Sequence, residues 1–406
     1  MTASVPNLAY ATAEPAAAGI LPVAGDVVIA VGKAIYRLEA SWRGFESEAE
    51  GHVFQSFDWV SIWQATIGRR DGVVPHIVTG WGPDGRLLFL LPFGIGRIWG
   101  LKVLFWLGGR QADLKGGLFA RDFLHLLGEA EWARLWQRVK DHLPPVDLIH
   151  LADQPERLGS SPNPFIAGLT HLQPDRTHYT RLKGTWPAYY ESKRPSAARR
   201  EDRRRARKLD ALGVVGFEIA RDPAGIAGLL ERLFAGKAEL LARMGVRDPF
   251  ADETVRAFYR RQTERPYPAG LGLLSALTLN GGPIAIDFGF IFKGRFYYLL
   301  SAYDAKFHHA SPGTRHLQEL MRWCLEQGIE AFDFGVGEQG YKYDWCEEHV
   351  RLYATIKGCT AAGRVAAVWF GARARLKLLI KTSTILWPLA QAVRARFGRA
   401  SNGAPL

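Results

Sequence analysis

Cysteine is scarce in this chain, which has only three in 406 residues: Cys324, Cys346 and Cys359. They are too few and too scattered for a disulfide framework, and none belongs to a CxxC or Cys/His pair with zinc-ligand spacing. The sequence therefore predicts a protein of a reducing compartment with no metal and no bound cofactor. Cys324 stands beside Trp323 on an apolar helical face and is expected in the core.

Long hydrophobic runs and a charged amino-terminal stretch are also missing. No eighteen consecutive apolar residues occur, and the nearest candidate, 365–393, is interrupted by basic residues and Pro388. Residues 1–26 are rich in Ala and Pro but have no Lys or Arg ahead of an apolar run, unlike a secretory signal. We expect a flexible segment over 1–26, no membrane-spanning helix, and a cytoplasmic protein, with peripheral attachment to the inner face of the cytoplasmic membrane as the alternative.

Acidic residues are rare in two segments that hold the basic surplus. Between Lys193 and Lys208 there are nine basic residues and two acidic ones, a surplus of seven. From Arg351 to the end there are ten basic residues and no acid. Because the net charge of the whole chain is +12, the remainder carries −5 and the basicity is local.

The first basic segment, Arg199–Lys208, has two interpretations. It suits a solvated connecting helix, and it equally suits a site for phosphates or lipid headgroups. Nucleic acid is disfavoured as its partner, because no helix-turn-helix, RNP or finger pattern accompanies it.

The second basic segment, Arg373–Arg399, resembles a helix that lies in the plane of an anionic membrane. In its first turns apolar residues share one face and lysines another: Leu376, Leu379 and Ile380, against Lys377 and Lys381. The alternative is a terminal helix packed on the preceding domain.

Apolar periodicity and turn residues predict the order of elements. In the first half they predict helices over 57–67 and 129–142 and strands over 73–81, 86–93, 101–107 and 146–151. In the second half they predict helices over 223–244, 252–261 and 312–327 and strands over 272–279, 283–292, 295–302 and 329–334. Both halves run helix, antiparallel strands, helix, strand. The pattern indicates an α/β (α+β) fold with a structural duplication.

The helix predicted from Pro312 opens with small residues. Its first backbone N–H groups are free to face an anion, and the helix dipole favours negative charge there. Ser311 is also a good N-cap residue, and Pro312 suits the first helical position. Capping explains those two residues, whereas Gly313 and Thr314 are less explained, since Gly in a first turn costs stability.

The meander, the Ser311-Pro312-Gly313 helix start and the run from Phe332 to Lys342 (FDFGVGEQGYK) together resemble a known family. They are similar to the GNAT-type acetyltransferase domain of the BioF2-like or CelD-like (cellulose biosynthesis) group, which is related to the FemAB peptidyltransferases with two such domains in tandem. Phe54-Gln55-Ser56 and Phe57-Asp58-Trp59 resemble the amino-terminal signature of the group.

This resemblance implies two GNAT-like domains, each a mixed, mostly antiparallel sheet flanked by helices, over 27–178 and 179–358, and a basic amphipathic tail over 359–406. It also implies acyl-CoA as a co-substrate, held at Ser311, Gly313, Thr314 and Arg315. Ordinary members hold the cofactor pyrophosphate with a Gln/Arg-x-x-Gly-x-Gly/Ala loop. Here Ala310-Ser311-Pro312-Gly313-Thr314-Arg315 stands in its place.

Amine acylation needs a base for the ammonium, donors for the oxyanion and an acid for the leaving thiolate. The candidate catalytic residues are Asp333, Tyr341, Lys342, Asp287 and His308. Asp333 ends a strand beside glycines, where α/β sheets often bind ligands. Tyr341 suits protonation of the thiolate, and Lys342 suits a phosphate or carboxylate.

Each candidate also has a structural interpretation. Asp287 suits a strand position facing solvent, His308 an ordinary loop histidine, and Tyr341 and Lys342 plain surface residues.

The leading hypothesis is an N-acyltransferase that moves an acyl group from acyl-CoA to an amine of an envelope saccharide or lipid, such as the amino alcohol of a ceramide-type (sphingolipid) synthesis. One alternative is FemAB-like aminoacyl transfer from tRNA to a cell-wall precursor. Another is a non-catalytic accessory protein of exopolysaccharide or cellulose assembly. Acceptor identity and acyl length depend on pocket shape, which the sequence does not specify.

Overall fold

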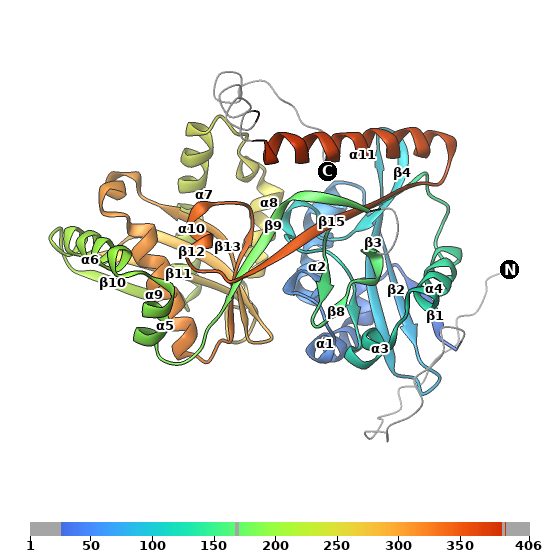
Figure 1. Cartoon of the computed structure of the whole chain (residues 1–406), viewed down its shortest axis with the longest axis horizontal. Helices are drawn as coiled ribbons and strands as arrows, with labels where there is room; N and C mark the ends of the chain where they lie inside the picture. Colours follow the sequence, from blue (N-terminus) through green and yellow to red (C-terminus); the bar gives the residue numbers. More distant parts are fainter. Residues whose placement is uncertain (1–25, 167–169, 384–385, 387–406) are drawn as a thin grey trace.

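The computed structural model describes residues 26–166, 170–383 and 386 and shows helices around one large sheet (Figure 1). The helices are α1 (Glu39–Glu48), α2 (Phe57–Trp63), α3 (Arg121–Leu126), α4 (Glu129–Asp141), α5 (Trp186–Lys193), α6 (Ser196–Asp210), α7 (Pro223–Arg243), α8 (Glu253–Gln262), α9 (Pro312–Glu326), α10 (Gly340–Tyr343) and α11 (Ala361–Thr382). A π-helical segment, η3 (Gln64–Gly68), continues α2, and a 3-10 helix, η7 (Ala305–Ala310), precedes α9.

The strands of the main sheet follow the order β1-β2-β3-β4-β6-β15-β9-β14-β13-β12-β11-β10, with β5 paired to β3. Those of the first half are β1 (Val28–Gly32), β2 (Val74–Trp81), β3 (Leu87–Ile98), β4 (Leu101–Trp106), β5 (Leu118–Phe119) and β6 (Leu148–Pro155). Those that follow are β9 (Thr170–Arg181), β10 (Val215–Ile219), β11 (Gly272–Leu279), β12 (Gly282–Phe292), β13 (Arg295–Tyr303), β14 (Ala331–Val336) and β15 (Glu348–Gly358). A separate hairpin is formed by β7 (Arg157–Leu158) and β8 (Ser161–Pro162).

Each half of the chain contains an antiparallel meander followed by a helix and a parallel strand. In the first half α4 leads into β6, which pairs in parallel with β4. In the second half α9 leads into β14, which pairs in parallel with β13. The expected mixed α/β fold with a structural duplication is therefore confirmed.

The two halves complete each other's sheets through two long strands, which cross the middle of Figure 1. β9, which follows the first half, pairs with β14 of the second half, and β15, which follows β14, pairs with β6 of the first. β9 and β15 also pair with each other. The boundary expected near residue 178 lies inside β9, and the division into domains stays a prediction.

A shared hydrophobic core also joins the halves. The indole of Trp59 on α2 is fully buried, and its centroid lies 5.1 Å from the rings of both Phe258 on α8 and Phe290 on β12. Phe54 lies 5.7 Å from Tyr297 in the same core. Because aromatic rings dominate core energetics, the first half is a packing partner of the second.

The other face of the sheet is covered separately in each half. α3 and α4 cover the first half. α5 and α9 cover the second, where Cys324 is fully buried, as predicted. α11 packs on β15, β9 and β6.

Local turn chemistry explains why the meanders were predictable. Asn280 and Gly281 both have positive φ, as do Lys293 and Gly294. A two-residue hairpin turn whose twist matches that of its strands needs positive φ at both central residues. The predicted helices and strands agree with the structure to within a few residues, apart from β3, which continues to Ile98, and β6, which begins at Leu148 and continues to Pro155.

The structure also contains elements that were not expected. They include β1, α1, α3, α5, β9, β10 and β15. Helix α11 begins at Ala361, twelve residues before the predicted basic helix, and the remainder of that prediction from residue 387 lies outside the described residues, as does 1–25. In the described ranges, no helix is both long and apolar enough to cross a bilayer.

Candidate functional site

Strands β13 and β14 run parallel but pair only where they begin. Arg295–Tyr297 pairs with Ala331–Asp333, and beyond these residues β14 pairs only with β9. A β-bulge at Phe288/Gly289 also distorts β12 against β13. The strands therefore diverge toward their carboxyl ends, where ligands of open α/β sheets bind. We call this divergence, between 298–303 and 334–336, the fork.

A buried polar network lies beside the fork on the face covered by α9. Asp287 on β12 is only 1% exposed, so the interpretation as a solvent-facing residue is wrong. The Tyr298 hydroxyl donates to Asp287 Oδ1 at 2.9 Å, and His316 Nδ1 lies 3.2 Å from Asp287 Oδ2. His316 Nε2 in turn lies 3.0 Å from Ser275 Oγ. A buried carboxylate needs such partners, because desolvation without them is costly.

Burial sets the protonation of this network. It lowers the pKa of His316, so the imidazole is neutral at pH 7. It raises the pKa of the Tyr298 phenol well above its usual range, and the neighbouring Asp287 carboxylate adds to the shift. With a proton on His316 Nδ1, that N–H lies beside Asp287 Oδ2 at 3.2 Å without the geometry of a hydrogen bond, and His316 Nε2 accepts a hydrogen bond from the Ser275 hydroxyl. We assign that tautomer, because it places the proton beside the carboxylate and leaves Nε2 to accept from Ser275.

Tyr341, on α10, lies on the other side of the fork. Its ring centroid is 6.1 Å from that of Phe334 on β14. The residue is 41% exposed as a whole, but desolvation of its hydroxyl raises the pKa of Tyr341 to about 12, and the negative charge of Asp287 contributes. The phenol therefore keeps its proton at neutral pH and is suited to donate it rather than to accept one.

Asp333 ends the paired part of β14 and has its carboxylate fully engaged. Its Oδ1 accepts from the Thr177 hydroxyl at 3.0 Å and from the Gly335 N–H at 2.9 Å, and Oδ2 lies 3.3 Å from the Arg295 guanidinium. The side chain is 1% exposed. Asp333 therefore links β14, β13 and β9 at the base of the fork.

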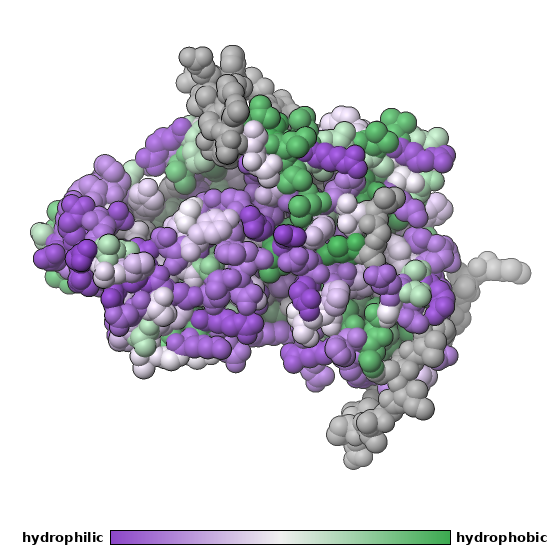
Figure 2. All heavy atoms as spheres, viewed as in Figure 1, coloured by the Kyte–Doolittle hydropathy of each residue, from purple (hydrophilic) through white to green (hydrophobic). Residues whose placement is uncertain are grey.

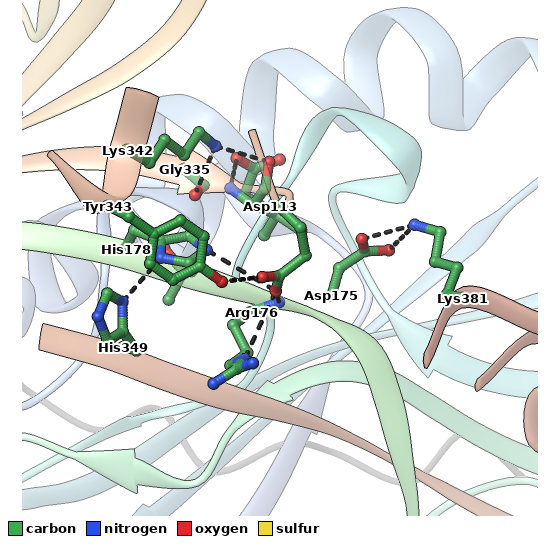
Figure 3. Close-up of polar contacts among 12 residues, drawn as sticks. Asp113, Asp175, Arg176, His178, Gly335, Lys342, Tyr343, His349 and Lys381 are labelled. Carbon is green, nitrogen blue, oxygen red and sulfur yellow. Dashed lines mark hydrogen bonds and ion pairs between the residues drawn. The ribbon is translucent and has the colours of Figure 1, made fainter. Parts of the chain in front are cut away.

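Lys342 and Asp113 hold the far end of β14, as Figure 3 shows. The buried Lys342 ammonium donates to the carbonyls of Gly335 and Val336 at 3.1 and 3.0 Å. Asp113, from the first half, accepts from the Val336 N–H at 3.1 Å. Burial lowers the pKa of Lys342 and raises that of Asp113 to about 6. Lys342 is thus committed to backbone carbonyls at a point where both halves meet.

A histidine pair on β9 and β15 supports the segment that carries Tyr341 (Figure 3). His178 Nδ1 lies 2.8 Å from His349 Nδ1, so one imidazole donates and the other accepts. Burial lowers the pKa of His178 to about 4. Glu338 accepts from the Arg176 N–H at 3.1 Å and from the hydroxyl of Tyr343 on α10. These contacts tie α10 to β9.

The start of α9 differs from the expectation in one respect. Ser311 occupies the N-cap position in a left-handed conformation with φ 52°, and its side chain makes no capping hydrogen bond. Its carbonyl accepts from the Thr314 N–H at 3.1 Å. A non-glycine residue in this conformation is strained, and such strain gathers at functional sites. Gly313 is in the first turn, where helix geometry provides its N–H with no intrahelical partner.

The remaining predicted residues are on the surface. Arg315 is paired with Glu319 one turn along α9 at 2.8 Å. His308 is exposed on η7, and its Nδ1 contacts the Ala305 carbonyl at 3.0 Å, within its own segment. The structure thus brings Asp287 and Tyr341 to the fork, Asp333 to its base and Lys342 to its far edge, whereas His308 interacts locally.

Two surface hollows lie elsewhere. One, of about 450 Å³, is lined by residues of β10 and the start of α7, and another, of about 550 Å³, is lined by residues of α1 and α3 with Trp81. Neither lining includes a residue of the fork.

Residues 196–343 match the family model described as acetyltransferase (GNAT) domain. The second half of this protein contains a GNAT acetyltransferase domain. The matched range contains the fork, the Asp287 network and the start of α9. Acyl transfer is the class of activity that this domain indicates.

Solved structures share the fold over most of the chain. The crystal structure of FemX has a TM-score of 0.55 at 12% identity, covering 77% of this chain and 95% of that one. A conserved protein of unknown function from Bacteroides thetaiotaomicron has a TM-score of 0.51 at 11% identity, covering 80% and 99%. No curated protein matches the sequence. These likenesses establish the fold alone.

In the GNAT domain, the residues suited to an acyl-CoA phosphate are at the start of α9. Gly313 brings a backbone N–H with no side chain in the way, and Thr314 adds a hydroxyl. A Cβ at Gly313 would meet only Tyr303 Cδ1, at an ordinary 3.5 Å, so the fold itself does not require glycine there. The absence of a side chain at Gly313 leaves room for a ligand to approach the backbone closely.

Sequence reasoning missed Tyr298, His316, Ser275 and Asp113. His316 had a signal, since it stands on the buried stripe of α9 beside Leu317. A histidine among apolar positions of an amphipathic helix indicates a buried polar partner. No local sequence signal marked Ser275 or Tyr298, because only the strand register places them beside Asp287. Asp113 had no signal either, because it stands 223 residues before its partner Val336 in the sequence.

Proposed function

We propose that this protein is an N-acyltransferase that transfers an acyl group from acyl-CoA to an amine of a cell-envelope saccharide or lipid. The observation that carries the proposal is the Tyr298–Asp287 hydrogen bond at the fork of a GNAT domain. This hydrogen bond provides a base, the Asp287 carboxylate, which a proton reaches through the Tyr298 hydroxyl beside the point where β13 and β14 separate. The start of α9 provides a candidate anion site nearby.

Amine activation is assigned to Tyr298 and Asp287. As the amine nitrogen attacks the thioester carbon, its proton passes to the Tyr298 oxygen while the Tyr298 proton passes to Asp287 Oδ1. Because burial keeps the pKa of Tyr298 far above neutrality, the two transfers are concerted and no free tyrosinate accumulates. His316 Nδ1 lies 3.2 Å from the second oxygen of Asp287 and is assigned the role of positioning the carboxylate.

The leaving group is assigned to Tyr341. Collapse of the tetrahedral intermediate breaks the C–S bond, and the CoA thiolate takes the proton of the Tyr341 phenol, whose pKa of about 12 keeps it available. Tyr341 is then reprotonated from solvent, and Asp287 releases to solvent the proton that it received through Tyr298. The ladder between β13 and β14 ends at Tyr297 and Asp333, so backbone N–H groups of β13 beyond that point are the candidate donors for the oxyanion.

Asp333 and Lys342 are positioning residues in this proposal. Asp333 binds Thr177, Gly335 and Arg295, and Lys342 binds the carbonyls that end β14. Both therefore determine how far β14 diverges from β13. Neither side chain is needed for proton transfer.

The envelope acceptor is supported by charge. Residues 199–208 form part of α6, on which Arg200, Arg203, Arg207 and Lys208 are exposed. With the basic carboxyl-terminal segment, they suit a membrane surface on the cytoplasmic side. A long-chain amino alcohol, as in ceramide-type synthesis, is one lipid acceptor of this class.

The test is release of free CoA by the full-length protein. Acyl-CoA donors from acetyl to palmitoyl would each be combined with amino sugars and amino alcohols. In a separate reaction, aminoacyl-tRNA would be combined with a cell-wall precursor. The proposal expects thiol release that depends on both an acyl-CoA and an amine. Consumption of aminoacyl-tRNA alone would favour the peptidyltransferase, and no turnover with any pair would contradict the proposal.

A further inference from the structure

Helix α11 has an inner face made of small residues and one aromatic ring. Gly363, Ala366, Phe370 and Gly371 are buried. A Cβ at Gly363 would meet the Asp147 carbonyl oxygen at 1.7 Å, so only glycine allows the helix to lie this close. The inner face therefore anchors α11 to the sheet and determines which face points outward.

The outer face of α11 is apolar. Val365 and Val368 are each 73% exposed, Trp369 45%, Leu376 57% and Leu379 62%. Their spacing by three, four or seven residues places them on one stripe, opposite the buried residues. Over 365–379 the stripe is about 21 Å long at 1.5 Å per residue. An apolar stripe of this length on the outside of a protein indicates an interaction surface.

Trp99 extends the stripe from another part of the chain. It is at the turn between β3 and β4, with φ 50°, and is 57% exposed. Its ring centroid lies 4.7 Å from that of Trp369 and 5.3 Å from that of Phe370. A bulky residue is rarely found in this conformation. Two exposed indoles side by side suit the boundary between a bilayer and water.

Charge around the stripe identifies its partner. α11 contains no acidic residue, and the basic residues Arg364 and Arg375 flank the stripe on one side and Arg373 on the other. In the described part of the chain no carboxylate pairs with these three arginines, and Arg373 lies 5.4 Å from the Trp369 ring centroid. Figure 2 shows hydrophobic and hydrophilic residues alternating along this helix. An apolar stripe between cationic edges complements anionic lipid headgroups over acyl chains.

The end of α11 is connected to the fork. Lys381 Nζ lies 2.6 and 2.8 Å from the two oxygens of Asp175 on β9 (Figure 3). Two residues further along β9, Thr177 donates to Asp333. The surface and the site are thus held in a fixed relation by one strand.

We propose that the outer face of α11, together with Trp99, lies in the interface of an anionic bilayer and brings the fork close to a lipid substrate. This deepens the proposed function by selecting the lipid as the acceptor class, and it rests on that function for its purpose. The contacts with the bilayer in this proposal are the apolar stripe and the three flanking arginines.

The test is sedimentation of the full-length protein with vesicles of phosphatidylcholine, with and without phosphatidylglycerol. The double substitution L376E/L379E removes two apolar contacts and adds negative charge. It is expected to lower binding to the anionic vesicles at least about tenfold, since burial of one leucine alone is worth that much. The control is L126E, at a leucine on α3 that is 64% exposed, which should bind as the unchanged protein does.

Three outcomes would overturn the proposal. They are no binding of the unchanged protein to anionic vesicles, equal binding by L376E/L379E, and a dimer without vesicles that L376E/L379E converts to a monomer. Turnover with a water-soluble amine and a short acyl-CoA distinguishes a failure of the membrane proposal from a failure of the proposed acyltransferase function. It should be the same in L376E/L379E and in the unchanged protein, because both leucines are on the surface away from the fork.

Discussion

The carboxylate of Asp113 accepts a hydrogen bond from the backbone N–H of Val336, at 3.1 Å. Gly335 beside it has φ 69°, and a Cβ there would lie 2.6 Å from Asp113 Oδ2. The first half of the chain therefore reaches the end of β14, one of the two strands that form the fork. The GNAT domain is shaped by a residue outside its matched range.

Replacement of Asp287 by asparagine should abolish most activity. Asparagine keeps the size of the side chain but cannot take the proton that Tyr298 passes on, so kcat should fall about 10²- to 10⁴-fold, the range of general-base contributions. KM for acyl-CoA should change little. Steady-state thiol release measures both constants. Asp210→Asn, at an exposed carboxylate ending α6, is the control, and an equal loss in both variants would refute the assignment.

Replacement of Tyr341 by phenylalanine should lower kcat by about tenfold or more, because the thiolate loses its proton donor. Since burial raises the pKa of Tyr341 to about 12, the rate of the unchanged protein should not decline on the alkaline side up to about pH 10. Tyr36→Phe, at a tyrosine that is 70% exposed in the first half of the chain, is the control and should keep the full rate. A pH–rate profile that is unchanged in height in Tyr341→Phe would exclude the acid role.

Replacement of Gly313 by alanine should stabilise the fold and weaken acyl-CoA binding. Alanine is favoured over glycine in a helix by about 1 kcal/mol, and the new Cβ meets only Tyr303 at 3.5 Å. Urea unfolding and calorimetric titration with acyl-CoA measure the two effects. Gly228→Ala on α7, where a Cβ meets nothing within 4 Å, should stabilise the fold similarly without changing affinity. Unchanged affinity in Gly313→Ala would remove the anion site from the start of α9.

Glu46 should make the fold less stable as pH rises. Burial raises its pKa from 4.5 to about 7, although the Phe57 N–H donates to it at 2.6 Å. The folded state then binds more protons than the unfolded state between these values, so up to about 3 kcal/mol of stability is lost between pH 4.5 and 7. Buried histidines such as His178, with a pKa of about 4, act in the opposite direction.

The comparison with Glu46→Gln isolates this effect from the histidines. Glutamine keeps an acceptor for Phe57 and does not titrate, so the variant should gain stability relative to the unchanged protein as pH rises from 4.5 to 7. Urea unfolding at several pH values measures the difference. If the unfolding free energies of the two proteins change with pH in parallel, the raised pKa of Glu46 is contradicted.

The meanders were predictable because their signals are local. Asn280-Gly281 and Lys293-Gly294 determine two turns, and the strands they connect are rich in apolar residues. β9 was missed because its sequence, THLQPDRTHYTR, contains a proline, charges and few apolar residues. It is a strand because β14 and β15 flank it on both sides, which no local pattern records.

The site was predictable in its residue types more than in its connections. Asp287 and Tyr341 could be named because they stand in or after strands of a recognisable meander. Tyr298 and Ser275 could not be joined to Asp287 without the register that places Ser275 opposite Asp287. Asp333 and Lys342 were read as reactive groups, whereas their partners, Thr177, Arg295 and two backbone carbonyls, are supplied by tertiary structure.

The most direct test of acyl transfer at the fork is mass spectrometry of the product formed by the full-length protein from an acyl-CoA and an amine. The account predicts an amide whose amount equals the CoA released and whose formation nearly disappears in Asp287→Asn. An amide formed equally well by Asp287→Asn, or CoA released without any amide, would contradict it.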